Sequence, residues 1–282
     1  LSPVSGLLSS LSVAGRELLA SPLGPCLFRP PTEIDTASSV DRGWAKMWRD
    51  AGLDDLSTEL CSLSQVGCEG GQPVAVTELI SRNPDGDVCF QTRIRCGLRS
   101  DGELLVEVRV VSSPWLPPLP RVGVTMGLTP TCAAMSWYGR GPHESYCDRK
   151  RSAHIGQYRA TVSELFHGFI VPCETGGIED LRWAALRDEE GNGLMVIGDG
   201  HMHFGVLPYP VAAVDRAGHT NELPLEQGVY VHLDAAHAGM GGDDGWTRNT
   251  HPEYRVEPGT FEYEFRLRPL RPGDDPGRLY QG

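Results

Sequence analysis

The sequence predicts an all-β protein built as one large antiparallel double sheet. Short apolar or alternating runs recur along most of the 282 residues, and clusters of Gly, Pro, Asn and Asp separate them. Two of these separators, Asp85-Gly86 and Asp101-Gly102, are typical of tight hairpin turns. Roughly a dozen or more strands are too many for an immunoglobulin-type sandwich, so a larger sandwich or barrel is favoured.

The N-terminal region is expected to be the least regular part. Residues 1–20 predict two short extended segments around Gly6 and Gly15, and the proline-rich stretch 21–39 predicts a connector without regular structure. A lead-in over 1–15, a sandwich over 16–269 and a loose Pro/Gly-rich tail over 270–282 are expected.

One short helix is expected near the N-terminus, over residues 41–53. Trp44, Met47 and Trp48 recur on one face of that helix, as expected for a helix that docks on a sheet. Asp41 is the candidate N-cap, and Gly52 marks the end.

Strands account for most of the remaining chain. A single helical turn is expected over 163–167. The expected strands are 60–65, 74–81, 87–97, 104–112, 121–128, 134–138, 181–187, 194–198, 203–207, 228–235 and 260–268.

Charge and composition exclude two classes of partner. The formal net charge is -12, and Arg149-Lys150-Arg151 is the one compact basic run, so nucleic-acid binding is not expected. No apolar run approaches the ~20 residues that span a membrane.

The eight cysteines have wide spacing and no Cys-x-x-Cys pair. Unpaired thiols in the cytoplasm or another reducing compartment are therefore expected. Residues 1–20 do not resemble a secretory signal. The sequence begins at Leu1 and not at Met, so either a separate subunit or a segment of a longer chain fits it.

The most unusual stretch is the loop 239–246, which has four glycines, two adjacent acids and a terminal tryptophan. Its flexible backbone, the carboxylates of Asp243 and Asp244 and the ring of Trp246 would suit a polyhydroxylated ligand. A tight bend that buries Trp246 in a core is the alternative. A dinucleotide site is excluded, because two acids would repel a pyrophosphate.

Two histidine patterns are candidate sites. His201 and His203 would share one side of an extended strand, but no third ligand is evident, so no metal site is predicted. His219 and Glu222 join an imidazole and a carboxylate, the pair that sugar epimerases use as acid and base; a polar surface loop is the alternative.

The stretch 137–149 combines aromatic residues, two glycines and several ion-pair partners. It predicts a strand that ends in a tight loop, with a structural role for its charged side chains. The candidate loop-supporting residues are Arg140, His143, Glu144, Asp148 and Arg149.

This stretch, Trp-Tyr-Gly-Arg-Gly-Pro-His-Glu-x-Tyr-x-Asp-Arg, resembles the signature of the C-terminal domain of glycoside hydrolase family 2 β-galactosidases, which also occurs as a separate small chain. Further matches lie along the chain in the same order as in the family, on both sides of this stretch. They extend the resemblance to about residues 16–269. They are 21–23, 29–35, 116–123, 182–183, 219–223, 239–246 and 251–254.

The resemblance implies a super-sandwich related to galactose mutarotase. In the family, the catalytic glutamates and the magnesium and sodium sites lie in a barrel that precedes this domain, and no barrel-sized βα pattern exists here. No catalytic residue, metal or cofactor is therefore expected in this chain. A barrel-bearing large chain or preceding domain, a galactoside and a larger complex or oligomer are the implied partners.

The resemblance also implies a role for the loop 239–246. Trp246 would form the platform for the aglycone part of lactose, in the active site of the neighbouring barrel. Asp243 and Asp244 are candidate substrate-binding residues that shape this loop. A stand-alone carbohydrate-binding or interaction subunit is the alternative, and an aldose epimerase using His219 and Glu222 is a weaker one.

The sequence departs from the family pattern at two places. Ile34 replaces a polar residue in a loop expected near the domain interface. The family's Pro-Gln-Glu-Asn-Gly is replaced by Pro-Cys-Glu-Thr-Gly over residues 172–176. These changes favour an altered interface with the barrel.

Overall fold

Antiparallel strands make up most of the regular structure. The computed structural model describes the chain except for residues 14, 37–42, 70–71, 245–246, 248–249 and 282, and describes only the backbone of 66–69. The all-β prediction is confirmed, because the described residues form two packed antiparallel sheets and a small hairpin of β1 (Ser12–Val13) and β2 (Arg16–Glu17).

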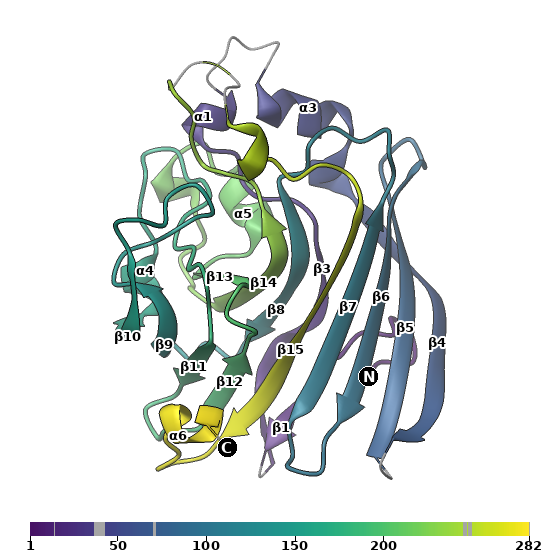
Figure 1. Ribbon diagram of the computed structural model, residues 1–282, viewed down its shortest axis with the longest axis vertical. Helices are drawn as coiled ribbons and strands as arrows, with labels where there is room; N and C mark the ends of the chain where they lie inside the picture. Colours follow the sequence, from purple (N-terminus) through teal and green to yellow (C-terminus); the bar gives the residue numbers. More distant parts are fainter. Residues whose placement is uncertain (14, 37–42, 70–71, 245–246, 248–249, 282) are drawn as a thin grey trace.

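The larger sheet has the order β10-β9-β11-β12-β15-β7-β6-β5-β4 within the described residues. Its strands are β4 (Ser57–Glu69), β5 (Gln72–Arg82), β6 (Val88–Leu98), β7 (Leu104–Ser112), β9 (Ala134–Gly141), β10 (His154–Thr161), β11 (Trp183–Arg187), β12 (Gly193–Ile197) and β15 (Thr260–Leu270). The predicted turns at Gly86 and Gly102 connect β5 to β6 and β6 to β7, and both glycines have positive φ. The C-terminal strand β15 lies in the middle of this sheet, between β12 and β7 (Figure 1).

The smaller sheet packs behind the larger one, in the order β13-β14-β8-β3 (Figure 1). Its strands are β3 (Leu19–Cys26), β8 (Arg121–Leu128), β13 (His203–Leu207) and β14 (Val229–His237). The core lies between the sheets, where alternate residues such as Val106, Val108 and Val110 of β7 belong to one buried cluster with Met126 and Leu233.

Short helices lie around the sheets. They are α1 (Glu33–Thr36), α3 (Trp44–Asp50), α4 (Val162–Leu165), α5 (Val211–Arg216) and α6 (Pro276–Gln281), with 3-10 turns η1 (Leu53–Asp55), η2 (Thr220–Glu222) and η3 (Pro252–Tyr254). The turn expected near 163–167 is α4. Within the described residues, no helix is both long and apolar enough to cross a membrane.

The expected helix over 41–53 is present as the shorter α3. Trp44 and Trp48 are buried on one face, as predicted. The N-cap is Gly43 and not Asp41, which lies outside the described residues. The helix ends early because Gly52 is in the left-handed region, with φ 70°.

The segment 21–39 is more regular than its prolines suggest, which corrects the expected connector. Most of β3 and all of α1 lie in it. Strand β3 is at the edge of its sheet and is irregular at two points in its register, a position at which prolines are tolerated.

Two further elements differ from expectation. Strand β10 was not predicted, because it is an edge strand in which no residue is buried, so its sequence shows no apolar alternation. The expected loose tail instead contains α6, whose Leu279 and Tyr280 pack against the cluster of Trp183 and Met195.

The cysteine side chains that the structure describes are unpaired. All seven whose side chains are described carry free thiols.

One end of the molecule gathers the segments singled out by the sequence. Helices α1 and α3, the turn η3 and the described part of the loop that follows β14 all lie at this end, and α6 lies at the other (Figure 1).

Candidate functional site

The glycine-rich loop follows β14 directly, and its first residues are anchored to two other segments. The Gly239 amide donates a hydrogen bond to the Tyr254 carbonyl at 2.9 Å, and the Gly241 amide donates to Asp148 Oδ2 at 2.9 Å. A Cβ on Gly239 would lie 3.0 Å from both Asp148 Oδ2 and Tyr254 Cβ. Glycine is therefore needed for this close approach.

The two acidic residues of the loop have partners close by in the chain. Asp243 Oδ1 lies 2.8 Å from His251 Nε2, and this contact raises the pKa of His251. The Asp244 carboxylate accepts hydrogen bonds from the Thr247 amide at 2.7 Å and from its hydroxyl. Both acids thus shape the loop, while a role toward a sugar stays a prediction. Trp246 lies outside the described residues, so its predicted exposure also stays a prediction.

Three of the candidate loop-supporting residues lie near this loop. Asp148 accepts the hydrogen bond from the Gly241 amide, as described above. Glu144 Oε2 accepts the Gly176 amide at 2.9 Å, and Glu144 Oε1 pairs with Arg149 Nη2 at 2.8 Å. The Arg149 guanidinium also lies 5.1 Å from the centre of the Tyr146 ring.

Arg140 and His143 hold a different region, the connection between β9 and β10. Arg140 Nε pairs with Asp180 at 2.5 Å, and its Nη1 donates to the Lys150 and Ala153 carbonyls at 2.9 Å. His143 Nε2 lies 3.0 Å from Ser152 Oγ at the surface. These contacts hold the connection and do not involve residues 239–244.

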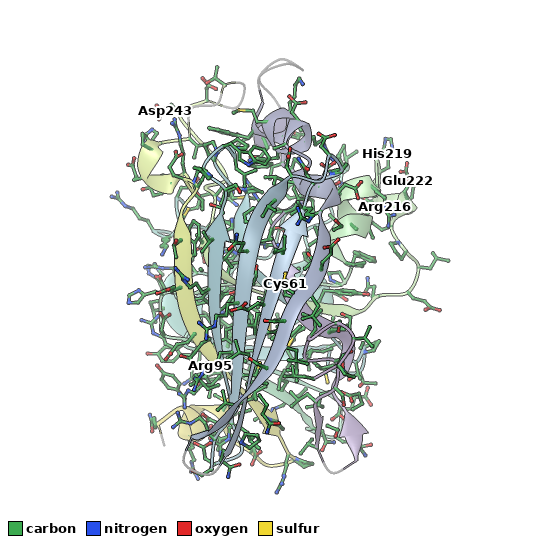
Figure 2. The ribbon with its side chains drawn as sticks, turned by 90° about the vertical axis from the view of Figure 1, so that its right-hand side faces the viewer. Cys61, Arg95, Arg216, His219, Glu222 and Asp243 are labelled. Atoms are coloured by element: carbon green, nitrogen blue, oxygen red, sulfur yellow. The ribbon has the colours of Figure 1, made fainter. Side chains whose placement is uncertain are left out.

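His219 and Glu222 contact each other, but both side chains are exposed to solvent. His219 Nδ1 lies 3.2 Å from Glu222 Oε1, and the two side chains are 65% and 50% exposed. The Gly218 amide and then His219 lower the pKa of Glu222, so this carboxylate is held ionised. Figure 2 places the pair on the side of the molecule away from Asp243. A solvated pair in mutual contact offers no enclosed space for a sugar.

An apolar cavity of about 320 Å³ opens beside the start of the glycine-rich loop. Its lining includes Met240 of the loop, Ile34 of α1 and the run Phe169, Ile170 and Val171. The three residues of the run are 41%, 80% and 47% exposed, and so large an apolar group at the surface is typical of an interaction site.

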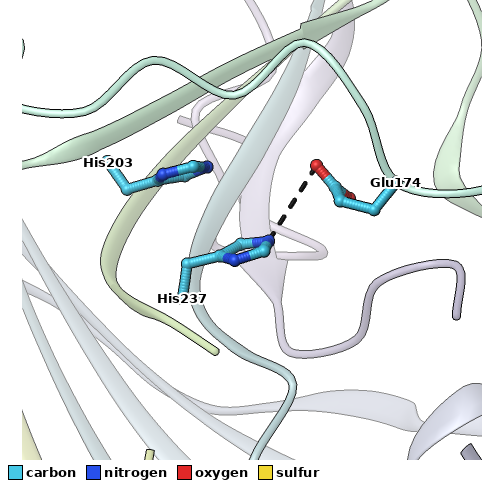
Figure 3. Close-up of side chains that lie close together, drawn as sticks. All are labelled: Glu174, His203 and His237. Atoms are coloured by element: carbon cyan, nitrogen blue, oxygen red, sulfur yellow. Dashed lines mark ion pairs between the residues drawn. The ribbon is translucent and has the colours of Figure 1, made fainter. Parts of the chain in front are cut away.

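A buried polar cluster lies beneath this end of the fold, and the sequence analysis did not predict it. Glu174, His203 and His237 all have buried side chains, and their side chains point toward one another (Figure 3). His203 Nδ1 lies 2.6 Å from Glu179 Oε1, and His237 Nδ1 lies 2.9 Å from the Ala238 carbonyl. Lys150 Nζ contacts the other oxygen of Glu179 at 2.9 Å.

Two buried arginines complete this network. Arg121 pairs with Asp234 at 2.9 Å and with Glu174 Oε1 at 3.3 Å. Arg29 pairs with Asp35 at 3.0 Å and contacts Met240 Sδ at 2.7 Å, which fixes the glycine-rich loop to the segment before α1. Burying charges in this way is stable only because each has a partner.

The environment shifts several pKa values in the network. Burial lowers the pKa of His237 well below its usual range, and the nearby cationic groups act in the same direction. Burial alone would raise the pKa of Glu179, but the hydrogen bond to His203 and the Lys150 ammonium lower it overall. Burial raises the pKa of Asp234 to about 6, against the influence of Arg121.

The cluster corrects one expectation about His201 and His203. His203 begins β13 and is buried, whereas His201 is exposed, so the two imidazoles do not share an environment. A third group does meet His203, namely His237. The register that pairs His203 with Asp234 brings His237 near, and this register cannot be read from the sequence.

Comparison with known protein families shows which family this chain belongs to. Residues 1–267 match the family described as the β-galactosidase small chain. The chain belongs to this family. A β-galactosidase of Vibrio cholerae is 35% identical over 269 residues, which cover 94% of the chain, and one of Klebsiella pneumoniae is 32% identical over 281 residues, again 94%.

The present chain spans about a quarter of the length of these relatives, since the matched residues cover 25% of each relative. Among solved structures, a galactose 1-epimerase from Lactobacillus acidophilus aligns with a TM-score of 0.42 and 8% identity, over 74% of this chain and 66% of the epimerase. At that score the likeness carries no argument about function.

Proposed function

We propose that this chain completes the aglycone side of a β-galactosidase active site whose catalytic residues lie in another part of the protein. The observation that carries the proposal is the small-chain family match over residues 1–267. The relatives named above are four times longer than the match, which leaves room for a barrel elsewhere. The catalytic glutamates, with magnesium and sodium, would lie there, and the substrates would be terminal β-galactosides such as lactose.

The glycine-rich loop supports a positioning role for this chain. Hydrogen bonds to Asp148 and Tyr254, and the contact of Met240 with Arg29, hold the first residues of the loop. A loop fixed at its base would present Trp246 to the neighbouring active site. The flat indole face would stack on the apolar face of the leaving sugar and orient it for cleavage.

The apolar cavity beside the loop supports a docking surface for the barrel-bearing part. Ile170 is 80% exposed on its rim, and Met240 joins the cavity to the loop. Covering this surface would place the loop at the contact between the two parts. The same contact would bury apolar area that is exposed in this chain alone.

The replacement of Trp246 tests the proposal. The chain is mixed with the barrel-bearing polypeptide from the same source, and lactose hydrolysis is followed. Trp246→Ala should raise KM for lactose about tenfold, the effect of losing roughly 1.4 kcal/mol of stacking. The control is Trp115→Ala, which removes a tryptophan that is 51% exposed on another part of the surface and should leave KM unchanged. Equal KM values in all three proteins would exclude Trp246 from the site.

A second experiment tests the docking surface separately. Ile170→Asp should weaken association with the barrel-bearing polypeptide in size-exclusion chromatography. Leu225→Asp introduces the same charge at an exposed apolar residue that does not line the cavity, and should not weaken the association. Undiminished association of the Ile170 variant would place the interface elsewhere.

A stand-alone interaction subunit is the second candidate. The half-buried Ile34, which replaces a polar residue of the family pattern, lines the apolar cavity and would suit another protein partner. Affinity purification from the native source separates the two candidates. Recovery of a barrel-bearing β-galactosidase chain would contradict the stand-alone function.

A further inference from the structure

Three side chains of types that can bind metals converge inside the protein, beneath the apolar cavity that Glu174 also lines. His203 begins β13, His237 ends β14, and Glu174 belongs to the segment between α4 and β11. One ligand atom from each lies within 4.8 Å of those of the other two (Figure 3). His237 Nε2 and Glu174 Oε1 are 3.9 Å apart, and the two imidazole rings stack at 4.4 Å.

The inner atoms of this cluster have no hydrogen-bond partner among the described residues. They are His203 Nε2, His237 Nε2 and Glu174 Oε2. All three side chains are at least 95% buried. Buried polar atoms without protein partners are costly and rare in folded proteins, so three of them facing one another form a place where a polar atom or an ion can bind.

Each imidazole is oriented by the contact of its Nδ1, the ring nitrogen that faces away from the cluster. His237 Nδ1 donates to the Ala238 carbonyl, which leaves the lone pair of Nε2 directed inward. His203 Nδ1 contacts the Glu179 carboxylate, which fixes the corresponding tautomer. A carboxylate or carbonyl behind the imidazole is the arrangement found for histidines that bind metals.

The charges around the cluster leave room for a cation. The groups linked to it by ion pairs are three carboxylates and two cations: Glu174, Glu179, Asp234, Arg121 and Lys150. With neutral imidazoles this set carries one net negative charge. Arg121 uses Oε1 of Glu174 and leaves Oε2 free.

We propose that Glu174, His203 and His237 form a binding site for Zn²⁺. Two imidazoles and one carboxylate are a donor set that suits zinc, with a water molecule as the fourth ligand. Two ligands of a tetrahedral zinc ion lie about 3.3 Å apart, so separations of up to 4.8 Å close by about 1.5 Å or less through side-chain movement.

The bound metal would act by linking three segments of the chain. It would link β13, the end of β14 and the segment 172–176 behind the glycine-rich loop. Because the ligands are buried, the metal would enter as the chain folds and exchange slowly afterwards. This inference does not depend on the proposed function.

Refolding with and without metal tests the site. The full chain is unfolded in guanidinium, then refolded either with EDTA or with equimolar Zn²⁺, and desalted. Elemental analysis should find about one zinc per chain after refolding with the metal, and the melting temperature should exceed that of the EDTA sample. Refolding with Co²⁺ should give the visible absorption of a tetrahedral N/O site. Metal-free protein with the same melting temperature after both treatments would overturn the proposal and leave water as the occupant.

Variants locate the metal. Glu179→Gln keeps all three ligands but weakens the support of His203, and should reduce zinc affinity about 10- to 100-fold. His237→Gln should abolish binding and the cobalt spectrum. His201→Gln removes an exposed histidine two residues from His203 and should bind zinc as the wild type does. If His237→Gln does not fold, the Glu179 variant decides: unchanged affinity there would contradict the assignment, as would loss of zinc from the His201 variant.

Discussion

Arg121 is enclosed by groups from several distant segments. Its guanidinium is fully buried and contacts Asp234 of β14, Glu174 of the segment 172–176 and Cys26 of β3. Two carboxylates share this one cation, so its removal would leave both of them buried and unpaired. The sequence shows Arg121 only as the first residue of a strand, and its partners are 53 and 113 residues away.

Arg121→Met should therefore be strongly destabilising. The free energy of unfolding should fall by about 3–5 kcal/mol, because two buried carboxylates lose their partner. Urea denaturation measures the change. The matched control is Arg109→Met: Arg109 and Glu262 are 53% and 69% exposed, and loss of such a surface pair costs about 1 kcal/mol or less. Similar losses for both variants would contradict the role of Arg121.

The pH dependence of stability tests the burial of His232. Burial, together with the Arg121 cation, lowers the pKa of His232 well below its usual range, and Cys26 Sγ lies 3.7 Å from its Nδ1. Below about pH 6.5 the unfolded chain binds a proton that the folded chain does not bind. The stability that this residue contributes is therefore present above that pH and is lost as the pH falls.

The comparison with His232→Gln isolates this effect. Between pH 6 and 5, the wild type should lose about 1.2 kcal/mol more than the variant. A difference is needed because Asp234, with a pKa raised to about 6, binds a proton more readily when folded and changes stability in the opposite direction. Parallel pH profiles for the two proteins would show that His232 is not buried in its neutral form.

At the scale of elements, the sequence predicts local features better than long-range pairing. The hairpins at Gly86 and Gly102 could be predicted because turn residues and alternation lie close together in the chain. Strand β10 could not, because its residues are polar and exposed on an edge. Strand β3 was hidden by prolines that an edge position tolerates.

The pairing of β8 with β14 offers a test at this scale. A Cβ on Gly123 of β8 would clash with Asp234 and lie 2.6 Å from the Leu233 carbonyl. Gly123→Ala should therefore lower the free energy of unfolding by about 3 kcal/mol, because the backbones must separate. Gly97→Ala in β6 is the control, since its Cβ would make only an ordinary contact at 3.7 Å and should change stability by less than about 1 kcal/mol. Thermal denaturation compares the two, and equal effects would contradict the close approach.

At the scale of the whole molecule, the parts of the candidate site with an unusual local composition could be predicted, and the part assembled by the fold could not. The loop 239–246 and the stretch 137–149 each show an unusual local composition, so both were found, and Asp148 does contact Gly241. The cluster of Glu174, His203 and His237 is assembled from three segments by sheet order and register. Its histidines are ordinary in their local context, so only the fold brings them together.

At this scale we propose that the chain is one part of a larger enzyme, and this can be measured directly. The chain is titrated into the separately produced barrel-bearing polypeptide, and lactose hydrolysis is recorded at each ratio. Hydrolysis should rise with added chain and reach a plateau near one chain per barrel-bearing polypeptide. Hydrolysis that does not change at any ratio would contradict the proposed role in completing the active site.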